Sequence, residues 1–371
     1  MARSENPSNF RAKRPQVRPE SNGVINKENN GNLPAPPEPV VKPDDVVIAV
    51  MGVTGVGKSS FISNFSQKAV VGHGQKSCTT DVSIHPVCIN NKKIFLVDTP
   101  GFDDTERSDA VVLADVADWL AEAFHAGIKI SGIIYLSRIS DNRVSSSAKK
   151  SLLIFRKLLG QPNYSSVVIV TTHWDLVHPA AGAKRESELI ETDGFWKELI
   201  KGGAAVRRHD KGVTSATEII NHILSQNHRV TLQIQVEMAQ EGKTLADTEA
   251  GREINADIKQ LLEKHNEELK ALRAEMEEAL RKKDEESRKL LEEVRAELRA
   301  KMKKLEEAKK TLQMNLEEWR RKHAEETLKQ QDILHQVLGV QRNLKQAQER
   351  EIAAIQEQIA SLRKKRGCIV M

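Results

Sequence analysis

The sequence predicts an α/β domain with a mostly parallel sheet, followed by a long α-helical coiled coil. Two observations support this prediction. Between about residues 45 and 230, short apolar runs rich in β-branched residues alternate with longer amphipathic stretches. From residue 231 onward, proline is absent and Glu, Lys, Arg, Leu, Ala and Gln dominate. The first pattern is typical of a parallel sheet covered by helices on both faces, and the second of an extended helical region.

The first 44 residues differ from the rest in composition. They are rich in Pro, Asn, Ser and Glu, and such a segment buries too little apolar surface to offset the entropy lost on ordering. We therefore expect residues 1–44 to be disordered. Their basic cluster at Arg11, Lys13 and Arg14 could be a targeting or docking signal, but we favour a solvated tail, because such basic blocks are commonly plain tails.

The α/β region contains six apolar runs that we predict to be strands. They lie at residues 46–50, 83–89, 94–97, 132–136, 167–170 and 204–206. Amphipathic stretches at 109–124 and 145–159 are the predicted helices between them.

Bulk composition narrows the class of protein. The net charge is +5 over 371 residues, with basic and acidic residues mixed except near the two ends, which argues against a nucleic-acid partner. The three cysteines are widely spaced and lack a CxxC pair, so neither a disulfide framework nor a zinc site is indicated, and a reducing cytosol fits. No secretory signal is apparent, and no apolar run approaches the ~20 residues of a membrane span. Any membrane contact is expected to be peripheral.

The strongest motif lies at residues 52–59, GVTGVGKS, which matches G-x-x-x-x-G-K-[ST]. It follows a predicted strand and begins a predicted helix, as a phosphate-binding loop requires, so a chance glycine turn is the weaker reading. The glycines let backbone N–H groups turn toward phosphate oxygens. Lys58 then reaches the β- and γ-phosphates, and Ser59 supplies an oxygen to Mg²⁺. The predicted nucleotide contacts are Gly52, Thr54, Gly55, Val56, Gly57, Lys58, Ser59 and Ser60.

The second motif, D-T-P-G at residues 98–101, directly follows the predicted strand 94–97. Taken alone, such a motif is more often an ordinary turn. Downstream of a phosphate-binding loop, however, Asp98 stands where a carboxylate holds the Mg²⁺ ion, usually through water. Gly101 is where a backbone N–H is freed for the γ-phosphate.

The third motif, T-T-H-W-D at residues 171–175, ends the predicted strand 167–170. A carboxylate at this position accepts hydrogen bonds from N1 and N2 of guanine, a pattern that adenine does not offer. Asp175 is therefore the predicted base reader, with Thr172 and His173 as further nucleotide contacts. For Trp174, stacking on the base and packing against the domain both stay open.

Together, these motifs resemble the boxes of translation-factor-related GTPases. The Thr-His opening of the third motif, the D-T-P-G box and the helical tail look most like immune-associated, GIMAP-type GTPases and their septin and chloroplast-import-receptor relatives. The segments SCTT at 77–80 and RISDNR at 138–143 are similar to fungal members of that group. The resemblance covers about residues 46–225 and implies a P-loop NTPase G domain, here placed at 45–230, that binds GTP or GDP with Mg²⁺.

The same resemblance implies roles for individual residues. Either Thr79 or Thr80 would be the switch threonine that joins the Mg²⁺ shell, and we favour Thr79. The implied Mg²⁺ ligands are then Ser59, Thr79 and Asp98, and the implied catalytic residues are Lys58, Thr79, Thr80 and Gly101. The fifth, base-backing loop is expected at residues 207–210, although no Ser-Ala pair marks it.

One departure from related enzymes concerns hydrolysis. Phe102 follows Gly101, where Ras-like enzymes carry the glutamine that orients water, so we expect slow intrinsic hydrolysis. The resemblance implies that paired G domains complete catalysis. For that role the candidates, each of which is otherwise an ordinary surface residue, are His73, Gln75, Arg138 and Arg143.

The helical region repeats apolar or small residues at alternating spacings of four and three. This spacing predicts a coiled coil over residues 231–365. A single charged helix held by i,i+4 pairs is the alternative. The predicted seam contains Leu262, His265, Leu269, Leu272, Met276 and Ala279, then Leu291, Val294, Leu298, Met302 and Leu305, and later Leu344, Ile352, Ile355, Ile359 and Leu362.

The last residues, 366–371, contain a C-a-a-X box that predicts prenylation of Cys368, with Met at X favouring farnesyl. Four basic residues at 363–366 precede the lipid site, and the two signals together give stable attachment to an anionic membrane. We therefore expect a cytoplasmic protein held peripherally on the cytosolic face of a membrane.

The function that the sequence predicts is a membrane-anchored GTPase switch or oligomerising scaffold with slow GTP hydrolysis. Its predicted partners are a guanine nucleotide, further copies through the G domain or the coiled coil, and a membrane surface. The alternative is a coiled-coil scaffold that binds GTP or GDP without hydrolysing it. An ATP-hydrolysing P-loop protein ranks third, since Asp175 would then have no base to read.

Overall fold

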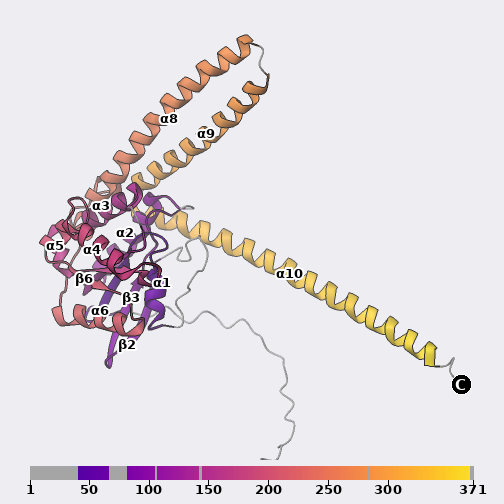
Figure 1. Cartoon of the computed structure of the whole chain (residues 1–371), viewed down its shortest axis with the longest axis horizontal. Coiled ribbons are helices and arrows are strands. Elements are labelled where there is room, and N and C mark those ends of the chain that lie inside the picture. Colours follow the sequence, from indigo (N-terminus) through magenta and orange to yellow (C-terminus); the bar gives the residue numbers. More distant parts are fainter. Residues whose placement is uncertain (1–40, 67–81, 105–106, 142–143, 283–284, 368–371) are drawn as a thin grey trace, which may run out of the picture. The chain divides into compact units, whose positions relative to one another are not determined.

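The computed structural model describes residues 41–66, 82–104, 107–141, 144–282 and 285–367. Within these ranges, six strands form one sheet in the order β2-β3-β1-β4-β5-β6 (Figure 1). Strand β2 is antiparallel to β3, and the other neighbours are parallel, which confirms the predicted α/β class. The strands are β1 (Val46–Met51), β2 (Ser83–Ile89), β3 (Lys92–Asp98), β4 (Gly132–Arg138), β5 (Val167–Thr172) and β6 (Ala205–Arg208).

Helices cover both faces of this sheet. Helices α1 and α6 pack on one face, where Phe61 and Ile220 join buried strand residues such as Ile48. Helices α2 and α3 pack on the other, where Leu113 and Phe155 lie. The helices are α1 (Lys58–Ser63), α2 (Asp109–His125), α3 (Ser146–Leu159), α4 (Pro179–Glu191), α5 (Lys197–Lys201) and α6 (Val213–Gln226), with 3₁₀ turns η1 (Gln161–Ser166) and η2 (Trp174–Leu176).

Local sequence sets the ends of the two helices on the second face. Ser108 precedes α2 and accepts a hydrogen bond from the backbone N–H of Val111 at 3.4 Å, and Ser145 does the same for Ala148 of α3 at 3.0 Å. Such caps satisfy backbone donors that the first turn leaves free. Helix α3 ends at Gly160, whose φ of 76° favours glycine. Both helices therefore begin within one residue of their predicted starts.

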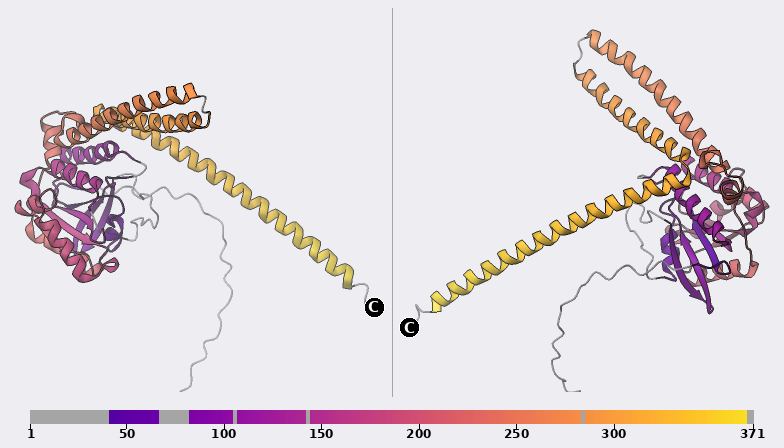
Figure 2. Two further views of the ribbon diagram at one scale, coloured as in Figure 1. Left: turned by 45° about the horizontal axis from the view of Figure 1, so that its top comes forward. Right: turned by 180° about the vertical axis from the view of Figure 1, so that it is seen from behind.

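The helical region consists of several helices. Helices α8 and α9 lie side by side (Figures 1 and 2) and are followed by α10. None of the helices within the described ranges is both long and apolar enough to span a bilayer. The elements are α7 (Gln233–Gln235), the π-helical turn η3 (Val236–Gln240), the 3₁₀ turn η4 (Leu245–Asp247), α8 (Glu249–Lys282), α9 (Glu285–Gln313) and α10 (Leu316–Gly367).

The beginning of α8 and the junction of α9 with α10 pack against the G-domain helices. Ile254 of α8, Leu312 of α9 and Trp319 of α10 are 1%, 0% and 6% exposed, and all three belong to the apolar cluster on the α2–α3 face of the sheet. Ion pairs between the helical region and α2 or α3 reinforce this packing. Lys150 contacts Asp257 at 2.6 Å, and Arg320 contacts Asp118 at 2.5 Å.

The predicted seam of the helical region has a partner inside the chain. Leu272 of α8 is 8% exposed, and Leu262 and Leu305 pack against the buried cluster. By contrast, Leu328 and Leu344 on α10 are 61% and 58% exposed. Part of the seam is thus covered by the α8–α9 pair, and a coiled coil with a second chain stays a prediction.

Candidate nucleotide-binding site

The phosphate-binding loop lies between β1 and α1, as predicted, and its shape depends on glycine. Gly52 has a φ of 143°, and a Cβ added to it would stand 2.6 Å from the carbonyl oxygen of Leu136. Gly57 has a left-handed φ of 94° and precedes the first residue of α1. Because L-residues rarely adopt these angles, the turn that aims the backbone N–H groups requires glycine at both positions.

Lys58 is the buried cation of this loop, with only 7% of its surface exposed. Its Nζ donates hydrogen bonds of 3.1 Å to the carbonyl oxygens of Gly52 and Val53. Burial lowers the pKa of Lys58 to about 8, although Asp98 and then Asp104 oppose that shift. The ammonium is therefore held against the loop, where a nucleotide phosphate would strengthen its charged form.

The residues at the ends of β3 and α1 fit the predicted Mg²⁺ ion. The Ser59 hydroxyl donates a hydrogen bond of 2.7 Å to Asp98, so two oxygen ligands from distant parts of the sequence meet at one place. Mg²⁺ prefers oxygen ligands of this kind. Ser60, the next predicted contact, is exposed on α1.

The D-T-P-G segment runs directly alongside the phosphate-binding loop. Thr54 donates from its backbone N–H to the carbonyl oxygen of Phe102 at 3.0 Å, and from its hydroxyl to that of Gly101 at 3.4 Å. A Cβ on Gly101 would stand 2.6 Å from the Thr54 nitrogen and 2.7 Å from Lys58 Nζ. Only glycine allows this approach. The ring of Phe102 is 5% exposed, so the position that follows Gly101 holds a buried apolar side chain.

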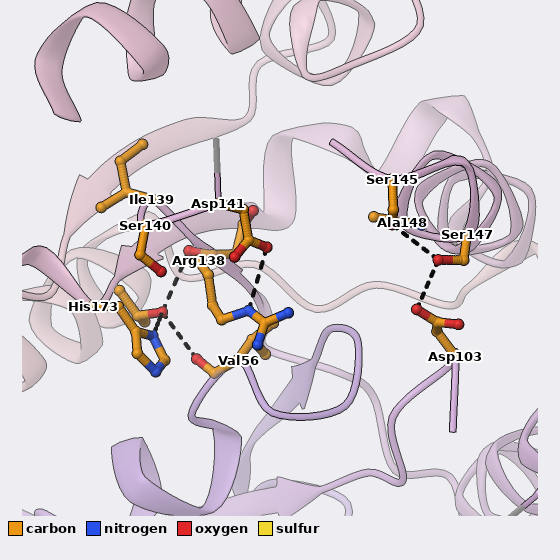
Figure 3. Close-up of polar contacts among 12 residues, drawn as sticks. Val56, Asp103, Arg138, Ile139, Ser140, Asp141, Ser145, Ser147, Ala148 and His173 are labelled. Carbon is orange, nitrogen blue, oxygen red and sulfur yellow. Dashed lines mark hydrogen bonds and ion pairs between the residues drawn. The ribbon is translucent and has the colours of Figure 1, made fainter. Parts of the chain in front are cut away.

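The third motif reaches the loop from the end of β5. The Thr172 hydroxyl donates 2.9 Å to the carbonyl oxygen of Val56. His173 has a left-handed φ of 59°, and its Nδ1 lies 3.0 Å from the Thr172 hydroxyl (Figure 3). Burial and then the nearby Arg138 lower the pKa of His173, against Asp175 and Asp141. The imidazole is consequently neutral near pH ~7.

Asp175 and its neighbour Trp174 have different surroundings in the structure. Asp175 is exposed in the middle of η2. Trp174 packs on Gly182 of α4, where an added Cβ would stand 2.6 Å from the ring, and its N–H donates to Thr171. Packing therefore accounts for Trp174. Of the residues 207–210 expected to form the base-backing loop, the first two still belong to β6 and the loop begins at His209, whose backbone N–H donates 2.8 Å to the carbonyl oxygen of Thr171.

Arg138, at the end of β4, lies beside the loop as well. A Cβ on Gly55 would stand 3.5 Å from its Nη1. Its Nε is 3.3 Å from a carboxylate oxygen of Asp141, and the Arg138 side chain is 37% exposed (Figure 3). Behind it, Arg185 of α4 donates to the carbonyl oxygens of Ile139 and Ser140 at 3.0 and 3.1 Å. No motif in the sequence singles out Arg185, whose role depends on the fold.

Asp103 is a second residue that sequence reasoning missed. It follows Phe102 with a φ of 64°, and its carboxylate accepts 2.8 Å from the Ser147 hydroxyl of α3 (Figure 3). Its backbone N–H donates 3.0 Å to Asp109 of α2. An aspartate two residues after D-T-P-G is the signal that was available, because Asp tolerates left-handed angles better than most residues. Asp103 thus ties the second motif to both neighbouring helices.

Several predicted residues lie outside the described ranges. They are Thr79 and Thr80, the two candidates for the switch threonine, together with His73, Gln75, Arg143 and the lipidation residue Cys368. Their assignments stay predictions.

Residues 47–173 match the family described as 50S ribosome-binding GTPase. They contain the phosphate-binding loop, the Ser59–Asp98 pair and the first three residues of the third motif. This part of the chain is a P-loop GTPase domain. A domain of this type binds GTP or GDP with Mg²⁺, and the residues described above fit both.

Relatives of this GTPase domain include GTP-binding protein A of Dictyostelium discoideum, which is 25% identical over 155 residues. The match spans 41% of this chain and 33% of that protein, so it covers about a third of the relative. Among solved structures, Toc33 from Arabidopsis thaliana in complex with Mg²⁺ and GMPPNP is 17% identical, with a TM-score of 0.41 and coverage of 50% and 86% of the two chains. A structure from work on the chloroplast translocon components atToc33 and psToc159, for whose GTPase activity dimerization is important, is 18% identical, with a TM-score of 0.39 and coverage of 51% and 86%.

Proposed function

We propose that this protein is a GTP switch that hydrolyses GTP slowly by itself and faster when two G domains pair. The observation that carries the proposal is the buried ring of Phe102, directly after Gly101. That position holds the water-orienting glutamine in Ras-like enzymes, and an apolar side chain cannot orient water. Bound Mg²⁺ would supply charge neutralisation at the phosphates, with Ser59 and Asp98 as its protein ligands.

Nucleotide binding itself is tested at Lys58. Replacing Lys58 with Ala removes the buried cation next to the phosphates, so GTP affinity should fall by at least about a hundredfold, given charge-assisted contacts of this kind. Lys301→Ala, at a residue 55% exposed on α9, serves as the matched control and should bind normally. Isothermal titration with GTP and GDP measures both. Unchanged affinity in Lys58→Ala would contradict the proposal.

Guanine selection is tested at Asp175. An asparagine there presents a donor where guanine also presents donors, so Asp175→Asn should lose most of the preference for GTP over ATP. The affinity for ATP should not change, because the phosphate contacts remain. Competition between the two nucleotides measures the preference. A variant that still selects GTP as strongly as the parent would show that another residue reads the base.

Activation by pairing is supported by the position of Arg138. A partly exposed guanidinium stands beside Gly55 at the rim of the phosphate site, where it is available to a facing copy. A positive charge supplied at such a site stabilises the charge that develops during phosphoryl transfer. The scaffold alternative predicts instead that bound GTP persists at any protein concentration. Single-turnover hydrolysis over a range of concentrations separates the two functions.

The anchoring part of the proposal rests on sequence. Cys368 and the basic residues 363–366 would hold the protein on the cytosolic face of a membrane, and α10 would link that anchor to the G domain. We also propose that the chain is a GIMAP-type GTPase, on the Thr-His opening at residues 172–173 and the helical tail. Pairing through the helical region would complement pairing through the G domain.

A further inference from the structure

Four side chains form a closed ring of contacts behind the loop that carries Asp175. The Trp174 indole N–H donates 3.0 Å to the Thr171 hydroxyl. That hydroxyl in turn donates 3.2 Å to Oε1 of Glu186 on α4. The Thr171 hydroxyl thus accepts one hydrogen bond and donates another, and in this way it connects Trp174 to Glu186.

Arg208 closes this ring from the end of β6. Its Nε donates 2.9 Å to Oε2 of Glu186, and its guanidinium carbon lies 4.3 Å from the centre of the Trp174 ring. Glu186 is 8% exposed and Thr171 is fully buried, so the contact between these two side chains is shielded from water and strengthened, whereas the Arg208 side chain is 45% exposed. A guanidinium over an indole adds a cation–π attraction.

The Trp174 ring also packs against α4. A Cβ on Gly182 would stand 2.6 Å from Cζ3 and 3.2 Å from Cε3 of the indole. The ring therefore contacts both α4 and the guanidinium of Arg208, and it has no room to shift toward Gly182.

The ring of contacts joins the two loops that are expected to hold the base. Thr171 lies near the end of β5 and Trp174 just after it, whereas Arg208 is the last residue of β6 and directly precedes the next loop. Asp175 follows Trp174 directly and is itself exposed, so the placement of its carboxylate depends on the backbone that Trp174 anchors. Two-point recognition requires that the acceptor be held to within about 0.5 Å.

We propose that Trp174, Thr171, Glu186 and Arg208 form a positioning cluster for guanine selectivity, which holds Asp175 in place without touching the nucleotide. This inference rests on the proposed role of Asp175 as base reader. It makes the cluster, and not Asp175 alone, the determinant of the preference for guanine over adenine.

The test uses Gly182→Ala, which pushes a methyl group into the Trp174 ring while improving helix propensity. Gly339→Ala on α10, where an added Cβ meets nothing within 4 Å, is the matched control. Affinities for GTP and ATP are measured by competition, with thermal unfolding as a check on folding. ATP carries the same phosphates, so its affinity reports on the phosphate-binding loop alone.

We expect Gly182→Ala to reduce the GTP-to-ATP affinity ratio about tenfold at unchanged ATP affinity, which corresponds to a modest displacement of one acceptor. Trp174→Phe keeps an aromatic ring but loses the N–H donor and part of the ring area, so it should fall between the parent and Trp174→Ala. A parental ratio in both Gly182→Ala and Trp174→Ala would overturn this inference while leaving the role of Asp175 intact. A wild-type chain without guanine preference would instead overturn the proposed function, and this inference with it.

Discussion

Arg138 stands at the outer side of the phosphate-binding loop, with its Nη1 3.5 Å from the point where a Cβ of Gly55 would lie. Its Nε also faces Asp141 at 3.3 Å. Among the described residues, Asp141 is the carboxylate that pairs with this guanidinium, and partly exposed pairs of this kind contribute at most about 1 kcal/mol. The proposed pairing of G domains could therefore redirect Arg138 toward a facing copy at little cost.

We expect Arg138→Ala to slow GTP hydrolysis at high protein concentration and to leave the rate at low concentration unchanged. Arg138→Lys keeps the charge but loses the planar fork, so it should restore only part of the rate. Single-turnover hydrolysis across a dilution series measures this. An equal loss at every concentration would place the action of Arg138 within its own site and contradict the pairing mechanism.

The lowered pKa of His173 makes stability depend on pH. Burial, followed by the charge of Arg138, disfavours the protonated imidazole in the folded chain, against Asp175 and Asp141. The unfolded chain, with the ordinary value of 6.5, thus binds more protons as the pH falls. The contribution of His173 to the free energy of unfolding is therefore fully present above pH 6.5 and is lost as the pH falls below it.

Thermal unfolding of the parent and of His173→Gln between about pH 7 and pH 5 checks this linkage. Glutamine does not titrate, so the parent should lose more stability than the variant over this range. Because other histidines also titrate, only the difference between the two proteins counts. Parallel curves would mean that His173 is protonated equally in both states.

The contact of the helical region with α2 predicts a stability effect. Leu312 of α9 is fully buried against the α2–α3 face, so Leu312→Ala should cost about 2–5 kcal/mol. Leu328→Ala, at a residue 61% exposed on α10, should change the free energy of unfolding by less than about 0.5 kcal/mol. Chemical denaturation of both variants provides the comparison. Equal effects would show that α9 does not pack on the G domain in solution.

Lipid attachment predicts separate effects for the cysteine and its basic neighbours. Cys368→Ser should release the protein from membranes entirely, because prenyltransferases read only a free C-terminal box. Replacing the basic residues 363–366 should leave the lipid in place and remove only the electrostatic part of membrane binding. Added salt should have the same effect on the parent protein, because a Debye length of about 8 Å already screens this attraction at physiological salt. Fractionation with mass spectrometry of the terminal peptide distinguishes these outcomes. An unmodified terminus would remove the anchoring proposal.

The sheet and the phosphate-binding loop could be predicted from local sequence, because parallel strands such as 167–170 are continuous apolar runs and the loop needs glycine at fixed spacings. Helix α4 was not predicted: its apolar pattern is weak, and of its residues only Gly182 and Glu186 are buried. The start of α10 had a signal, since Asn315 accepts from the backbone N–H of Glu318 at 2.8 Å as an N-cap.

The partners of individual side chains were less accessible to sequence reasoning. Trp174 had two equal readings, and only the position of α4 behind its ring decides for packing. Arg185 and Arg208 carry no motif, because their contacts join elements that are distant in the chain. The seam of the helical region predicted helices correctly, but a heptad pattern does not say whether its partner is the same chain.

The buried residues Leu232, Ile254 and Leu312 share one apolar cluster with the sheet. A shortened recombinant chain that stopped at residue 230 would expose the face of α2 and α3 that these side chains cover, and would tend to aggregate. The smallest fragment that still shields this apolar face from water extends through Trp319. Heat or denaturant should accordingly unfold the nucleotide-binding half and the adjoining ends of α8 and α9 in one cooperative step. Neither part is then expected to stay folded without the other.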